Sequence, residues 1–137
     1  MALPWLLRNA TRRFGRAARA RLEEAGFDLP TSGVWAVRAL DGHDRTATQL
    51  VSVLNLSKQA VSVLIDGLVD TGLVERQPHP HDRRRVMLAL TEQGRVAAKA
   101  IRAGTDSVME DLGSAVSPAE LATFHATLVA LVDRPET

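Results

Sequence analysis

The feature that most constrains the fold is the succession of patterns between Thr46 and Leu90. A short helical pattern precedes a turn at Asn55, and a longer helical pattern starts at Ser57. Two segments with strand character follow, joined by the loop that contains "HPHDRRR". A short helix joined by a tight turn to an amphipathic helix is a helix-turn-helix, and a hairpin directly after it makes the winged version. The sequence therefore predicts a winged helix-turn-helix within residues 30–91.

Local signals mark the helix ends of this unit. In "TATQ", Thr46 and Gln49 have the spacing of a capping box, and Ser57 suits the N-cap of the next helix. Gly72 is a typical residue for the end of that helix. The helix between them carries apolar residues at the i, i+3, i+4, i+7 spacing of a buried stripe, namely Val61, Leu64, Ile65, Leu68 and Val69.

The hairpin is predicted because apolar residues alternate along the chain with a period of two. Val86, Leu88 and Leu90 alternate with the residues between them, and residues 73–77 can form the partner strand. Pro78 and Pro80 stiffen the connection, and we expect them to keep it out of the ladder. The tip is therefore expected near residues 78–84.

The remaining helical patterns lie at the two ends of the chain, over residues 3–25, 92–115 and 117–132. Their apolar stripes are too long for a winged helix of roughly 60 residues to cover, so we expect a second copy of the chain to bury them. The fold class is mainly α with a small β-hairpin, divided into an N-terminal dimerisation helix (1–29), the winged helix-turn-helix (30–91) and C-terminal dimerisation helices (92–137). In such a homodimer the two recognition helices lie about 34 Å apart, which suits an inverted-repeat operator.

The positive charge is local. The net charge is only +1, but six arginines and no acid fall within residues 1–21, and Arg83, Arg84 and Arg85 form a second cluster in the hairpin loop. Basic patches of this kind can bind a polyanion even when the total charge is near zero. Double-stranded DNA is therefore the partner to test.

The helix that starts at Ser57 shows hydrogen-bonding side chains to solvent: Ser57, Lys58, Gln59 and Ser62. Gln can pair with adenine, Lys with guanine, and Ser with a base edge or a phosphate. The free N–H groups of a helix start also suit phosphate. A polar helix start is most often only capped and solvated, and the arginine-rich hairpin beside it is what favours DNA contact.

In an extended segment Asp82 and Arg84 point to the same side. We therefore expect the Asp82 carboxylate to orient the Arg84 guanidinium for a minor groove, while Arg83 and Arg85 on the other side contact phosphates or nothing. The alternative is a surface ion pair worth about 0–1 kcal/mol.

These residues resemble the winged helix of the MarR family, the multiple-antibiotic-resistance type of bacterial regulator. The resemblance is carried by "GLVER" (72–76), "DRR" (82–84) and "LTEQG" (90–94) in this spacing. It implies a homodimer joined by the first and the last two helices, residues 57–71 as recognition helix, and Arg84 as the residue that enters the minor groove. It further implies repression of transcription, relieved by a small aromatic or anionic ligand. The chain has no cysteine, and so departs from the peroxide-sensing branch.

For such a ligand the candidate pocket residues are Phe14, Trp35 and Arg38. The alternative is that Phe14 and Trp35 are core residues and Arg38 lies on the surface. No cofactor and no metal are expected, since there are no cysteines and "HPHD" is more simply a solvated loop than a metal site.

Other classes of protein fit less well. The sequence contains no phosphate-binding glycine loop and no recognisable nucleophile–base set, so we expect no enzyme. The alternative function is a winged helix that serves protein–protein contact without DNA binding. There is no apolar run of about 18 residues, so no membrane partner is expected and a cytoplasmic location follows by default.

Overall fold

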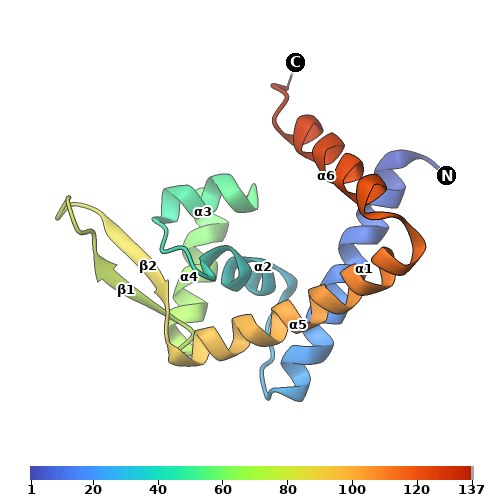
Figure 1. Ribbon diagram of the computed structural model, residues 1–137. Coiled ribbons are helices and arrows are strands. Elements are labelled where there is room, and N and C mark those ends of the chain that lie inside the picture. Colours follow the sequence, from blue (N-terminus) through green and yellow to red (C-terminus); the bar gives the residue numbers. More distant parts are fainter. Residues whose placement is uncertain (137) are drawn as a thin grey trace.

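The chain is mainly helical with one two-stranded antiparallel hairpin. The computed structural model describes residues 1–136 (Figure 1). Its elements are α1 (Leu3–Glu24), α2 (Thr31–Leu40), α3 (Ala47–Leu54), α4 (Lys58–Asp70), β1 (Val74–Pro78), β2 (Val86–Leu90), α5 (Glu92–Ala115) and α6 (Pro118–Val132). The order confirms the predicted fold class of a winged helix-turn-helix with additional helices at both ends.

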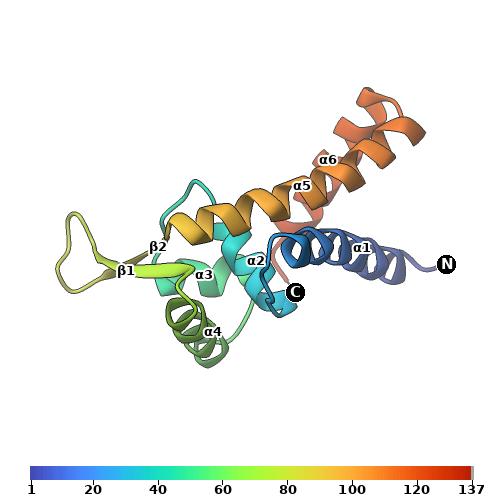
Figure 2. The same cartoon turned by 90° about the horizontal axis from the view of Figure 1, so that it is seen from below.

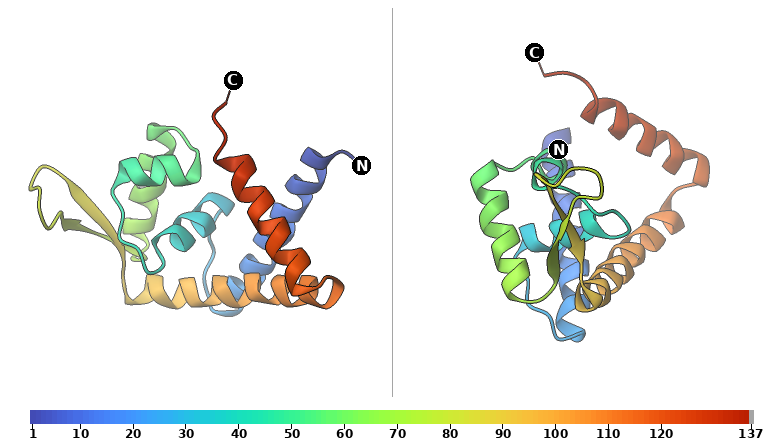
Figure 3. Two further views of the ribbon diagram at one scale, coloured as in Figure 1. Left: turned by 45° about the horizontal axis from the view of Figure 1, so that its top comes forward. Right: turned by 90° about the vertical axis from the view of Figure 1, so that its left-hand side faces the viewer.

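The long helix α5 connects two parts of the molecule (Figures 1 and 2). At its start α5 continues from the hairpin, which projects away from the helices as a wing. Helices α2, α3 and α4 lie together near the base of this wing. The second half of α5 packs along α1, and α6 then turns back across this pair (Figure 3). Among the described residues, no helix is both long enough and apolar enough to cross a membrane.

The helix ends follow the local signals. Thr46 accepts a hydrogen bond from the Gln49 backbone N–H at 3.2 Å, and the Gln49 side chain accepts from the Thr46 N–H at 2.9 Å. Asn55 ends α3 in the left-handed region with φ of 53°. Gly72 has φ of 79°, and the next residue, Leu73, donates its N–H back into the last turn of α4. These short-range interactions confirm the predicted helix-turn-helix.

The two strands of the hairpin pair in antiparallel register, with Val74 opposite Leu90 at one end and Pro78 opposite Val86 at the other. Pro78 is therefore the last residue of the ladder, and the expectation that it lies outside is wrong. A proline is tolerated there because both strands end at this position, next to the loop. Arg45 adds an isolated bridge to Leu88, with backbone hydrogen bonds of 3.1 and 2.7 Å, which the sequence pattern did not indicate.

One apolar core joins the winged unit to α1 and α5. Its fully buried large side chains are Leu22, Val34, Val37, Leu50, Val61, Val74 and Ile101. Helices α1 and α5 approach so closely that a Cβ added at Gly104 would lie 2.4 Å from the Ala17 carbonyl oxygen. Helix α6 has no buried residue, and its side chains Phe124, Val129, Leu131 and Val132 are exposed in the single chain.

Candidate nucleic-acid interface

The start of α4 presents the side chains that the sequence analysis selected. Ser57, Lys58, Gln59 and Ser62 are all exposed, while the opposite side of the helix is buried. The Ser57 hydroxyl accepts a hydrogen bond from the Ala60 N–H at 3.1 Å, so it serves as the N-cap. Because a hydroxyl also carries a donor, Ser57 can still donate to an anion while it caps the helix.

The electrostatic arrangement along α4 favours an anion at its start. Its first turn contains no acidic residue, and the helix start carries partial positive charge. Asp66 follows later, and its carboxylate lies 2.5 Å from the guanidinium of Arg76 on β1. This ion pair offsets a negative charge that would otherwise face an approaching polyanion.

Arg76 also lines a hollow of about 340 Å³ between α3, α4 and the base of the wing. Thr48, Lys58 and Ser62 line the same hollow, together with the apolar residues Ala47, Val51, Ile65, Val86 and Leu88. Its two hydroxyls and two cationic groups are of the kinds that contact phosphate oxygens. Neither Thr48 nor Arg76 was predicted as a site residue, because only the folded hairpin brings β1 beside α4.

The tip of the wing is a turn and not an extended segment. The Asp82 carboxylate accepts a hydrogen bond from the backbone N–H of Arg84 at 3.0 Å, and the Asp82 carbonyl accepts from Arg85 at 3.1 Å. The expected pairing of the Asp82 carboxylate with the Arg84 guanidinium is therefore corrected, since an aspartate at the first position of a turn bonds more readily to backbone N–H groups. Within residues 1–136, no ion pair ties Arg83, Arg84 or Arg85 to an acid.

His79 supports the same turn from the other side of the loop. Its Nδ1 accepts hydrogen bonds from the backbone N–H groups of His81 at 3.1 Å and Asp82 at 3.0 Å. The segment "HPHD" is thus an ordered connection in which histidine and aspartate side chains accept from backbone groups. All three arginines that follow are exposed at the tip.

Helix α4 and the wing are presented together. Helix α4 begins on the side of the molecule away from α5, and the tip of the hairpin also lies away from α5 (Figures 1 and 3). The two exposed elements are held to one another through β1, which packs on α4. A rigid duplex can therefore meet both at once.

A different hollow, of about 440 Å³, lies where α1, α2 and α3 meet. It is lined by Trp35 and Arg38 together with Thr11, Ala39, Val53 and Leu54. Phe14 is half-buried and is not among these lining residues, so the structure brings together only two of the three predicted pocket residues.

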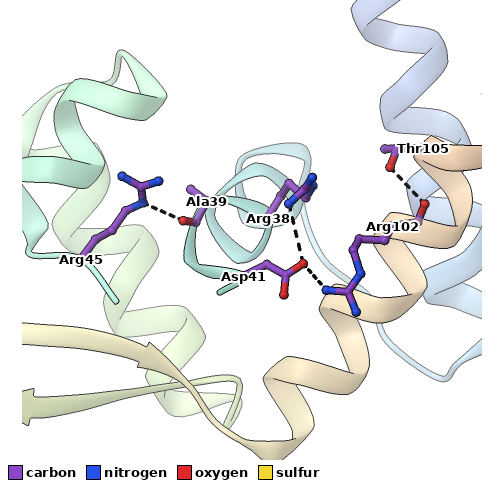
Figure 4. Close-up of polar contacts among 6 residues, drawn as sticks. All are labelled: Arg38, Ala39, Asp41, Arg45, Arg102 and Thr105. Carbon is purple, nitrogen blue, oxygen red and sulfur yellow. Dashed lines mark hydrogen bonds and ion pairs between the residues drawn. The ribbon is translucent and has the colours of Figure 1, made fainter. Parts of the chain in front are cut away.

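Arg38 at the edge of this hollow is linked to α5 through Asp41 (Figure 4). The Asp41 carboxylate lies 3.7 Å from Arg38 and also accepts a hydrogen bond from Arg102 of α5. Asp41 is thus shared by two guanidinium groups, one from the winged unit and one from the long helix.

The fold and the exposed site define a winged helix-turn-helix protein. The sequence of residues 27–85 matches the model of the MarR family. The chain belongs to the MarR family, which consists of transcription regulators and not of enzymes.

Individual relatives agree with this. The HTH-type transcriptional regulator PetP of Rhodobacter capsulatus is 34% identical over 88 residues, which cover 64% of this chain and 53% of PetP. The chain thus spans about half the length of that relative. The crystal structure of the MarR family transcription regulator SP03579 is 26% identical, with a TM-score of 0.77 and coverage of 96% of this chain and 83% of that chain.

The structure of NadR in complex with 4-hydroxyphenylacetate shares the fold. Its TM-score is 0.79 at 18% identity, covering 98% of this chain and 95% of NadR.

Proposed function

We propose that this chain is a sequence-specific DNA-binding repressor that acts as a homodimer on an inverted-repeat operator. Helix α4 enters the major groove by its N-terminal end. The arginines of the wing lie along the adjacent minor groove, with Arg84 inserted. The observation that carries the proposal is the joint exposure of an acid-free polar helix start and of three wing arginines that form no ion pair among residues 1–136, held together by β1.

The exposed apolar surface at the chain ends supports the homodimer. Trp5 is 53% exposed on α1, and Phe124 is 47% and Leu131 53% exposed on α6. Both helices lie at the end of the molecule away from the wing (Figure 3). Large exposed apolar side chains that gather at one end of a molecule suit a protein interface. Pairing through them leaves both winged units free for DNA.

The hollow beside Trp35 is the proposed ligand site. An indole face and a guanidinium suit a small aromatic anion, whose ring stacks on Trp35 while its charge pairs with Arg38. NadR, which shares the fold, was solved with 4-hydroxyphenylacetate, a ligand of this class. A carboxylate in the hollow competes with Asp41 for Arg38 and so alters the link to α5.

The DNA and dimer proposals are tested together with purified protein. Selection from a random duplex pool is expected to yield an inverted repeat, and sedimentation is expected to give twice the chain mass. Affinity should fall with salt at a log–log slope of about −0.9 per phosphate contact. A monomer, or a protein that retains no duplex at low ionic strength, contradicts the proposal and favours the protein–protein role.

The ligand proposal is tested with 4-hydroxyphenylacetate as probe. Quenching of tryptophan fluorescence that persists in Trp5→Phe and disappears in Arg38→Ala supports the site. Quenching that survives Arg38→Ala, or no release of the operator at saturating probe, contradicts it.

A further inference from the structure

Val63 is an exposed apolar residue in the middle of the candidate recognition helix. Its exposure is 67%, the highest among the large apolar side chains of α4. Val61, Ile65 and Leu68 of the same helix are buried. Since successive residues turn by about 100°, Val63 lies close to 180° from this stripe, on the outermost line of the helix.

Neither packing nor helix propensity accounts for a valine at this position. Branching at Cβ lowers helix propensity, and a valine with most of its surface exposed gains little from burial in the single chain. On one side Val63 borders a hollow of about 680 Å³, whose lining includes Leu29, Pro30 and Leu64. On the other side the surface carries hydrogen-bonding groups. Gln59 lies one turn earlier on the same line, and Ser62 is adjacent.

Toward the C-terminal end of α4, the surface next to Val63 lacks a projecting side chain. Gly67 lies one turn later, and a Cβ added there would meet no atom within 4 Å. A glycine inside a helix costs about 0.5–1 kcal/mol relative to alanine, so its presence is not explained by helix stability. The isopropyl group of Val63 therefore stands above its C-terminal neighbour and can be approached closely.

We infer that Val63 is a specificity-determining residue that contacts the C5 methyl group of thymine. This inference rests on the proposed insertion of α4 in the major groove. The thymine methyl is the apolar group that base pairs display in that groove, and apolar side chains are what contact it. Gln59 on the same line suits adenine. Each half-site is therefore expected to contain A·T pairs, with one thymine read by Val63 and an adenine nearby read by Gln59.

The test removes only the methyl group. In the selected operator, each thymine facing α4 is replaced by deoxyuridine, one position at a time and in both half-sites. Binding of the full-length wild-type protein should weaken at one position by about fourfold per half-site, the factor expected for one buried methyl group. Val63→Ala should bind the thymine and uracil operators with nearly equal affinity.

Val96→Ala is the matched control. Val96 is 51% exposed on α5, far along the chain from α4, and its replacement should leave the thymine-to-uracil ratio of the wild type unchanged. The inference is overturned if no uracil replacement weakens wild-type binding, or if Val63→Ala keeps the wild-type ratio. If the wild-type protein binds no duplex at all, the proposed function fails as well. Failure of the Val63 inference alone, with duplex binding intact, is therefore distinguishable from failure of the proposed function.

Discussion

The guanidinium of Arg76, on strand β1, lies 2.5 Å from the carboxylate of Asp66, on helix α4. This ion pair links the base of the wing to the proposed recognition helix. Both side chains are largely exposed, at 47% and 62%, so the pair contributes only about 0–1 kcal/mol to folding. Its greater effect is expected on DNA binding, because it offsets a negative charge close to the phosphates.

Arg76→Ala is therefore predicted to change stability by less than about 1 kcal/mol while weakening operator binding about tenfold. The loss has two parts, a missing cation and an unpaired Asp66 carboxylate that repels phosphates. Adding Asp66→Asn to Arg76→Ala should recover part of the affinity. Urea denaturation and a DNA titration measure the two effects. Equal affinity of the single and double variants would show that Asp66 does not face the duplex.

Arg84→Ala is predicted to reduce operator affinity by about 1–3 kcal/mol with no change in dimerisation, because Arg84 is the residue proposed to enter the minor groove and forms no ion pair among residues 1–136. Arg134→Ala is the matched control, an exposed arginine that follows α6 and lies outside both basic clusters. For both variants, a mobility-shift titration measures operator affinity and a sedimentation run measures dimerisation. Unchanged binding by Arg84→Ala would exclude the minor-groove role of the wing.

Asp82→Ala and Asp82→Asn are predicted to differ. The Asp82 side chain accepts the backbone N–H of Arg84, and an asparagine carbonyl can accept the same hydrogen bond. Asp82→Asn should therefore bind the operator nearly as well as the wild type, whereas Asp82→Ala should bind several-fold more weakly because its tip is less ordered. If asparagine fails as badly as alanine, the carboxylate charge matters and the turn geometry alone is insufficient.

Gly104→Ala is predicted to destabilise the protein by about 1–3 kcal/mol, the usual cost of overpacking. The new Cβ would lie 2.4 Å from the Ala17 carbonyl oxygen, so α1 and α5 must separate. Gly113→Ala, on the same helix with no atom within 4 Å of the added Cβ, should instead stabilise by about 0.5–1 kcal/mol. Thermal unfolding of both variants provides the comparison. A neutral Gly104→Ala would contradict the close helix contact.

The start of α6 is predicted to weaken in acid. The backbone N–H and the side chain of Ser117 hold the pKa of Glu120 below its ordinary value of 4.5. The contribution of a carboxylate with a lowered pKa is present above its ordinary pKa and lost as the pH falls through the lowered one. The helicity of wild type and Glu120→Gln should therefore converge as the solution is acidified. A constant difference in circular dichroism down to the acid limit would contradict this role.

Helix ends could be predicted well from the sequence because their causes are local. The capping boxes at Thr46 and Ser117, the N-cap at Ser57 and the left-handed Gly72 each involve residues within a few positions of one another. The wing was predicted from alternation, although Pro78 proved to belong to the ladder.

The sequence by itself thus determined the winged helix-turn-helix order and the exposed groups of α4 and the wing, since periodicity, caps and turns act over a few residues. Only the tertiary structure decided which distant residues meet. It placed Arg76 beside Asp66, Gly104 against Ala17, and Trp35 without Phe14 in the hollow near Thr11. It also showed Val63 to be uncovered. The physical reason is that such contacts depend on how whole elements pack, and one stripe on a helix does not specify its partner.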